Sequence, residues 1–236
     1  MADDNRPLKY MRYAIGEIVL VVVGILIALQ INNWNEERKD KLELIKILKK
    51  LEVEFETNKT ELNGSIHYHE QQYKATVKIE ELFNPNHAIP TDTIKNLIKQ
   101  AFTDWKFEPR LSITKSAMDS GKIALINNDS LTDNLNTWMY AIKKYNEIYA
   151  AINKDKEKLW DDIVKKYPIK NLDPTTLGVS NFKGDADGVF SNLKNENIIR
   201  SLRHQEEFIL VWCDALKEDH DDILRFIRNE LSENEH

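Results

Sequence analysis

The sequence predicts an all-α protein in which a single N-terminal transmembrane helix continues into an elongated helical bundle. Three observations in the 236-residue chain support this fold. One uninterrupted apolar run lies near the N-terminus. Beyond it, apolar residues recur at intervals of three and four, the period of an amphipathic helix. The connectors between these patterns contain Pro85, Pro90, Pro109, Pro168 and Pro174, residues that end helices.

The apolar run is predicted to cross a membrane. As a helix, residues 13–31 cover roughly 28 Å, close to the hydrocarbon thickness of a bilayer. Between Ile18 and Leu29 there is no polar side chain, whereas a water-soluble amphipathic helix would show one every third or fourth position. The run is longer than the apolar core of a cleaved signal peptide and lacks a small-residue cleavage site. The chain therefore divides into a tail (1–12), a transmembrane helix (13–31) and a soluble domain (32–236).

Polar and aromatic residues mark the two ends of the run. Arg12, Tyr13 and Trp34 are the predicted interface anchors, because basic and aromatic side chains favour the headgroup region. Glu17 lies about one turn inside the run, where an ionised carboxylate is unfavourable. Two interpretations stay open: Glu17 meets Arg12, a polar group of a neighbouring copy or a hydrated pore, or its side chain reaches back to the interface.

The same helix carries candidate packing residues. Gly24 and Ala28 form a small-xxx-small pair, which lets two transmembrane helices approach closely. With Glu17 and Gln30 they are the candidate residues for contacts inside the membrane, and they predict a homo-oligomer. On a helix, Glu17 and Gln30 point in directions about 140° apart, so a pore lined by both is disfavoured.

Five helices are predicted in the soluble part, at about 32–83, 92–102, 112–120, 129–167 and 196–231. The first continues the transmembrane helix, and its apolar stripe includes Phe55, Leu62, Ile66 and Tyr73, with a kink expected at Gly64. The fourth has the clearest stripe, with apolar residues at Leu131, Leu135, Trp138, Ile142, Tyr145, Tyr149, Ile152, Leu159 and Ile163.

Residues 168–195 form the one long connector, where helical periodicity disappears. Within it, Asp185 to Gly188 resembles part of a calcium-binding loop. Lys183 and Lys194 then occupy the end positions, where such a loop requires carboxylates. A turn built by Asp and Gly is therefore predicted instead.

No sequence motif indicates catalysis or a bound cofactor. On a helix, His67 and His69 point about 200° apart, so they are assigned to an exposed face rather than to a metal site. Asp214, Glu218 and Asp221 are assigned to a solvated acidic face. Phosphate-binding loops, H-E-x-x-H, G-x-S-x-G and C-x-x-C motifs are absent from the sequence. We therefore expect a protein that is not an enzyme and binds no metal or cofactor.

Charge and cysteine content set further bounds. The formal net charge is −6, and an acidic domain disfavours nucleic acid as a partner, because binding the phosphate backbone needs clustered Lys and Arg. The lipid bilayer is the expected partner, together with further copies or another protein. Cys213 is the single cysteine, which excludes an internal disulfide.

Two segments resemble a known family. The run YAIGEIVLVVVGILIALQINNWNEERK, from Tyr13 to Lys39, is similar to the N-terminal signature of an uncharacterised family of small membrane-anchored proteins from Gram-negative bacteria. SGKIALINNDSL, from Ser120 to Leu131, is similar to a second segment of that family. The resemblance implies an uncleaved anchor in the inner membrane and a helical domain on its periplasmic side. It brings no catalytic residues, and the tail here is less basic than is usual in the family.

These observations favour a membrane-anchored scaffold or accessory subunit that presents helical surfaces to a partner. A ligand sensor is one alternative, and it needs a concave pocket lined by Trp105, Phe107 or Trp138. A second alternative is an oligomeric channel or membrane effector with Glu17 and Gln30 in its pore.

Overall fold

The computed structural model describes residues 6–83, 91–103, 105–126, 128–172 and 178–234. For residues 6–10, 13, 91–94, 186 and 187 it describes the backbone alone. Over these ranges the chain contains helices and loops but no strand, which confirms the predicted all-α class. Three helices are long: α1 (Arg6–Glu81), α4 (Asp129–Lys166) and α7 (Leu193–Asn234). The shorter ones are α2 (Thr91–Phe102), α3 (Ser112–Asp119), α6 (Ala186–Phe190) and the 3-10 helices η1 (Lys122–Leu125) and η2 (Ile169–Leu172).

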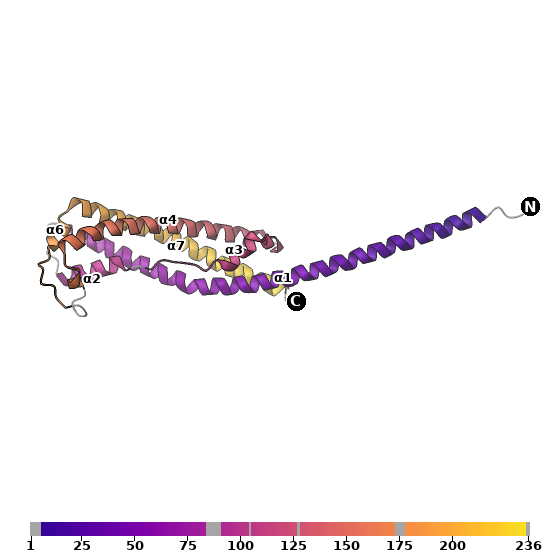
Figure 1. Ribbon diagram of the computed structural model, residues 1–236, viewed down its shortest axis with the longest axis horizontal. Helices are drawn as coiled ribbons and strands as arrows, with labels where there is room; N and C mark the ends of the chain where they lie inside the picture. The colour runs from indigo at the N-terminus through magenta and orange to yellow at the C-terminus, as the bar shows by residue number, and fades with distance from the viewer. Residues whose placement is uncertain (1–5, 84–90, 104, 127, 173–177, 235–236) are drawn as a thin grey trace, which may run out of the picture.

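Helix α1 extends from the N-terminal apolar run into the core of the domain. Its 76 residues give a length of roughly 114 Å at 1.5 Å per residue. The N-terminal part stands clear of every other element, and the remainder lies in the bundle (Figure 1). Among the described side chains of α1, burial begins at Leu48. The helix already begins at Arg6, so the predicted tail (1–12) is partly helical, because Pro7 is well tolerated in a first helical turn.

Cross-helix contacts show how the three long helices run. Phe55 of α1 contacts His220 of α7, and His69 further along α1 contacts Glu206, so α1 and α7 are antiparallel. Phe55 also contacts Trp138 of α4, with ring centroids 4.6 Å apart. His69 contacts Tyr145, so α4 runs parallel to α1. Helix α7 packs against both, and its C-terminus lies where α1 leaves the bundle (Figure 1).

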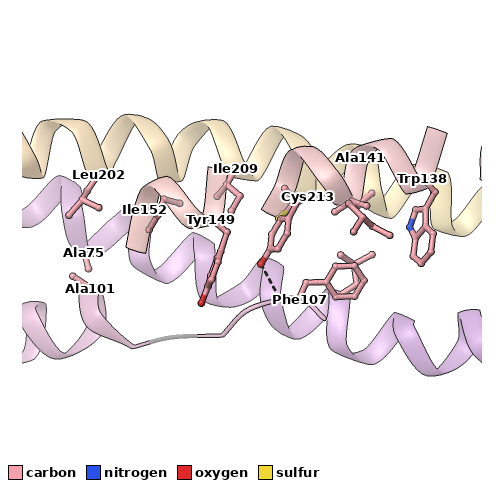
Figure 2. Close-up of a cluster of buried hydrophobic side chains, with 14 of the residues drawn as sticks. Ala75, Ala101, Phe107, Trp138, Ala141, Tyr149, Ile152, Leu202, Ile209 and Cys213 are labelled. Carbon is pink, nitrogen blue, oxygen red and sulfur yellow. Dashed lines mark hydrogen bonds between the residues drawn. The ribbon is translucent and has the colours of Figure 1, made fainter. Parts of the chain in front are cut away.

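The loop from α2 to α3 runs along the bundle between α1 and α4. Phe107 is fully buried, and its N–H donates to the Tyr145 hydroxyl at 2.9 Å. Figure 2 shows its ring pointing into the core on the side of Trp138. Asn58 holds the end of this loop by two hydrogen bonds: Asn58 donates to the Arg110 carbonyl at 2.9 Å and accepts from the Arg110 N–H at 2.8 Å. Phe107 and Asn58 therefore fix the loop to the bundle, whereas the other described residues from 105 to 111 are exposed or half-buried.

Gly64 makes room for this loop. A Cβ at Gly64 would lie 3.3 Å from the Trp105 ring, which stacks on Tyr68 with centroids 4.9 Å apart. Helix α1 remains α-helical through Gly64, and the kink expected there stays a prediction. The glycine lets the Trp105 ring approach the helix closely.

The predicted core stripes are confirmed for α4 and only partly for α1. All nine stripe residues of α4 are buried. In α1, the core positions beyond Phe55 include Asn58, Ser65, His69 and Gln72, whereas Ile66 and Tyr73 are only half-buried. Several core positions of α1 carry polar side chains, so a search for apolar residues does not identify the buried face of this helix.

The segment predicted as a connector (168–195) contains secondary structure. It includes η2 and α6, and α7 begins within it at Leu193. Asn195, which is fully buried, donates to the Val189 carbonyl at 3.0 Å and to Asp162 at 2.6 Å. Hydrogen bonds from side chains therefore join α4, α6 and α7 here, where the sequence has no repeating pattern of apolar residues. The predicted helix end at Asn84 to Asn86 lies outside the described residues.

Replacing Phe107 by Ala tests the structural role of the loop. We expect a loss of about 3–5 kcal/mol in unfolding free energy, because the change leaves a cavity in a close-packed core. Chemical denaturation in detergent, followed by circular dichroism, measures it. Phe182→Ala is the matched control, since Phe182 is 82% exposed. Equal effects of the two substitutions would contradict the assignment of the loop to the core.

Candidate functional site

The predicted membrane residues all lie on the isolated part of α1. This helix is the one among the described residues that is long and apolar enough to cross a membrane, and none of its apolar window is buried. Arg12, Glu17, Gln30 and Trp34 have exposed side chains. The side chain of Tyr13 lies outside the described residues.

The small-residue face of the anchor is uncovered in a single chain. Gly24 and Ala28 are exposed, and nothing lies within 4 Å of a Cβ built at Gly24. Glu17 lies two helical turns before Gly24, on nearly the same face. The structure therefore brings Glu17, Gly24 and Ala28 to one side of the helix and leaves Gln30 on another.

A chain of hydrogen bonds crosses the middle of the domain core. His69 Nδ1 lies 2.9 Å from Glu206 Oε2, and His69 Nε2 lies 3.1 Å from the Tyr145 hydroxyl. Tyr145 is also bonded to Ser65 Oγ at 3.0 Å and accepts from the N–H of Phe107. Helices α1 and α4 and the loop thus meet at one hydroxyl group, and α7 joins them through the bond from Glu206 to His69.

Burial dominates the electrostatics of this network. His69 is 1% exposed, and Tyr145 and Glu206 are fully buried. Burial raises the pKa of Tyr145 to about 12, so its hydroxyl stays protonated at neutral pH and can donate a hydrogen bond. Glu206 Oε1 accepts no hydrogen bond, and the nearest cation is the Lys156 Nζ at 3.9 Å.

The network has acid, imidazole and hydroxyl groups in sequence, as in many catalytic sites. Its central side chains, however, are buried within the described part of the chain. The arrangement is suited to fixing the rotation of three helices relative to one another, because buried polar groups must find partners.

Sequence reasoning missed this network, and it placed His69 on an exposed face, which is wrong. His67 is exposed as predicted. A usable signal was present in α7, where Glu206 stands between buried Leu202 and Ile209 in the apolar stripe. A polar residue at a stripe position indicates a buried partner, although the sequence does not say which one.

A groove lies on the outer face of α1, close to the anchor. It has a volume of about 630 Å³ and is lined by residues 42–57 of α1 and residues 110–113. Glu54 fixes one wall of the groove. Its carboxylate accepts hydrogen bonds from the backbone N–H groups of Ile113 and Thr114, at 2.7 and 2.9 Å, and from the side-chain hydroxyls of Ser112 and Thr114. A carboxylate from a distant helix therefore caps the N-terminus of α3.

An aromatic patch lies on the outer side of α4 and α7. Tyr140 and Trp212 form an edge-to-face pair with centroids 6.0 Å apart. Phe208 and Val211 beside them are 50% and 59% exposed. We call these four residues the aromatic patch. Exposed apolar surface of this kind marks contact sites on many soluble domains.

The side chains proposed for a sensor pocket do not form one. Phe107 and Trp138 are fully buried, and Trp105 stacks on Tyr68. These rings fill space in the core and along the loop.

Metal ligands do not cluster in the part of the chain that the structure describes. The segment predicted as a turn, Asp185 to Gly188, is instead the start of α6, where the Gly188 N–H donates to Asp185 Oδ1 at 2.8 Å as at a capped helix N-terminus. Asp214, Glu218 and Asp221 are exposed, as expected for a solvated acidic face.

Comparison with known proteins identifies one family. A family of unknown function, DUF6090, matches residues 17–195 of the chain. Curated proteins and solved structures gave no match.

A double-mutant cycle tests the buried network. We expect His69→Leu and Glu206→Leu each to cost about 3–5 kcal/mol, because each leaves its partner buried and unpaired. The double variant should cost at least about 1 kcal/mol less than the sum of the two. Denaturation in detergent measures the three values. His67→Leu, on the exposed face of α1, should change stability by less than about 0.5 kcal/mol. Additive effects would show that His69 and Glu206 do not act as a pair.

The single thiol gives a test of pH dependence. Burial raises the pKa of Cys213 from 9.0 to about 12, with further contributions from Asp214 and Glu206. The folded state thus holds its proton to higher pH than the unfolded state, and this contribution to stability is present below pH 9 and lost as pH rises towards 12. We expect negligible labelling by a disulfide reagent at pH 8 without denaturant, full labelling when unfolded, and a lower unfolding free energy at pH 10 than at pH 8. Rapid labelling of the native protein would contradict the burial of Cys213.

Proposed function

The chain belongs to the family of unknown function DUF6090, and we propose that it is a membrane-anchored helical scaffold, a self-associating accessory subunit without enzymatic activity. The observation that carries this proposal is the continuity of α1, which passes from an exposed apolar run into the core of the domain without a break. A helix of this kind holds the domain at a fixed distance and rotation relative to the run. Those are properties that an assembly platform needs.

Anchoring follows from the exposure of the run. Ile18, Leu20 and Leu26 are 63%, 75% and 59% exposed, and no other element of the described chain covers them. Each such side chain is stabilised by about 1.5–3 kcal/mol when it leaves water. A bilayer covers the whole circumference of the helix, whereas a protein partner covers one side. We therefore place the chain in a membrane, and by the family resemblance in the bacterial inner membrane with its domain in the periplasm.

Self-association is proposed through the small-residue face of the anchor. Two copies in one membrane are parallel, so a two-fold contact pairs Gly24 and Ala28 with the same residues of the second copy. Their small side chains allow the helix backbones to approach closely. Glu17 is then shared between the copies at the edge of the apolar run.

The aromatic patch is the second proposed contact between copies. In parallel copies the two aromatic patches lie at the same distance from the membrane. Phe208 and Val211 can then contact the same residues of the second copy, so that each apolar surface covers the other. Because the patch lies on α4 and α7 and the small-residue face lies on α1, substitutions can remove one contact without changing the other.

Mass measurement of the full-length protein in nanodiscs tests this function. We expect a defined oligomer that shifts to smaller species in Gly24→Ile/Ala28→Ile, because the larger side chains keep the helices apart while preserving hydrophobicity. Phe208→Glu/Val211→Glu should reduce the oligomer separately, by breaking the contact on α4 and α7.

Val164→Glu is the control, since Val164 is an exposed apolar residue of α4 that belongs to neither face. A monomeric wild-type protein would rule out self-association. An oligomer unchanged by both double substitutions would place the contacts elsewhere.

A further inference from the structure

The end of the bundle opposite the anchor carries a loop with exposed apolar side chains. We call residues 178–184 the tip loop. It leads directly into α6, which lies at that end of the molecule (Figure 1). Val179 and Phe182 of the tip loop are 71% and 82% exposed, and Ile169 of the preceding helix η2 is 41% exposed. Folding of a single chain therefore leaves these apolar side chains in water.

The backbone of the tip loop is fixed to the rest of the domain. The Ser180 N–H donates to Asn171 Oδ1 at 2.8 Å. Directly after the loop, the Asp185 N–H donates to the Lys166 carbonyl at 2.9 Å. Backbone groups near both ends of the loop are thus bonded to the segment that follows α4.

Two residues of the tip loop face the domain, and the apolar ones face away from it. Ser180 and Gly184 are half-buried, and a Cβ at Gly184 would lie 2.8 Å from the Tyr167 ring. Because the backbone is held at these two points, Val179 and Phe182 cannot turn inward without breaking those contacts. The fold itself holds both side chains in solvent, as expected for a contact surface.

The surroundings of the apolar side chains are basic. Between residues 165 and 184 the sequence contains four lysines and one acidic residue, which lies outside the described residues. Lys183 of the loop and Lys170 of η2 are exposed and form no ion pair within the described part of the chain. The Lys170 Cε lies 3.9 Å from a Cβ built at Gly178. The carboxylate after the loop, Asp185, is bonded to the N-terminus of α6.

An anionic bilayer is the partner that this combination favours. A few protruding side chains are too small a surface for a specific protein interface, which buries about 800 Å² on each partner. A bilayer accepts inserted apolar side chains without a preformed pocket, and its anionic headgroups attract lysines near the surface. A second copy is a poor partner, because parallel copies would bring the same lysines together.

This bilayer is distinct from the one proposed to hold the anchor. From Ile31, at the end of the apolar run, to Glu81, helix α1 covers roughly 75 Å. The tip loop lies at the far end of the bundle from the run (Figure 1). An unbroken helix that crosses one membrane holds the loop roughly that far from its surface, so a bilayer that meets the loop is a second one.

We propose that the tip loop binds the surface of a second, anionic bilayer that faces the membrane crossed by α1. Val179 and Phe182 insert between the lipid headgroups, and Lys170 and Lys183 pair with the lipid phosphates. The inference rests on the proposed anchoring, which orients the domain, but not on self-association. It gives the scaffold a second attachment point and makes the length of the domain the spacing between two membranes.

Binding of nanodiscs to vesicles tests the proposal. Full-length protein in phosphatidylcholine nanodiscs is mixed with vesicles of phosphatidylcholine alone, or of phosphatidylcholine and phosphatidylglycerol in equal parts. The nanodisc scaffold protein that floats with the vesicles is measured against lipid concentration. We expect an affinity at least about tenfold higher for the anionic vesicles, because each lysine near an anionic surface contributes about fivefold. Empty nanodiscs provide the background.

Substitutions in and beside the loop separate its two contributions. Lys170→Glu/Lys183→Glu should lower the affinity for anionic vesicles by more than about tenfold. Val179→Ser/Phe182→Ser should lower it by at least a similar factor, because two apolar side chains no longer leave water.

Matched control variants lie on other parts of the domain. Lys115→Glu/Lys143→Glu changes the net charge equally at exposed lysines of α3 and α4, and Val164→Ser removes an exposed apolar side chain of α4. Both should leave vesicle binding unchanged, and circular dichroism confirms the folding of each variant.

Equal affinity for the two vesicle types, or binding that both loop variants retain, would overturn the bilayer contact. Absence of flotation with either vesicle type would overturn it in favour of a protein partner for the loop. A chain that nanodiscs do not retain would overturn the anchoring, and with it the bridging of two membranes. Vesicle binding by a monomeric protein would support the tip loop while contradicting self-association.

Discussion

One unbroken helix must be compatible both with an apolar environment around its first part and with the core of the domain around its second part. The rest of the structure depends on this constraint. In its first part, α1 is apolar on all sides and touches no other element of the described chain. From Leu48 onward, one face of the same helix is the core of the domain and the opposite face is charged. Because the backbone hydrogen bonds continue through the junction, the rotation of the anchor and the rotation of the domain are coupled. The small-residue face and the groove are therefore fixed in relation to each other.

Polar groups specify how the bundle closes on α1. Along the second half of the helix, the core positions include Asn58, Ser65, His69 and Gln72, each bonded to another element. Apolar side chains pack acceptably in several registers, whereas these groups are satisfied in one register only. Ion pairs at the two ends of the contact between α1 and α7 also favour one register. They join Arg228 to Glu52 and Glu56, and Arg203 to Glu80.

The loop from α2 to α3 connects the core to the surface sites. Its central residue, Phe107, fills the space between α1 and α4, and its end at Arg110 forms one wall of the groove. The hydrogen bond from Phe107 to Tyr145 joins this loop to the buried network (Figure 2). The groove and the polar core of the domain are thus parts of one connected structure.

Much of the architecture follows from local sequence. The apolar run, the continuation of its helix and the stripe of α4 were predictable because composition and period act over a few turns of one helix. The identity of the core on α1 was not, since His69 and Glu206 are 137 residues apart and neither is apolar. The groove was equally hidden, because its wall comes from a loop that Glu54 holds against a distant helix. Sequence alone therefore determined which long segments are helical and which one is apolar enough for a bilayer. Only the tertiary structure decided which polar groups are buried together and which surface stays open, because those outcomes depend on the register and rotation between helices.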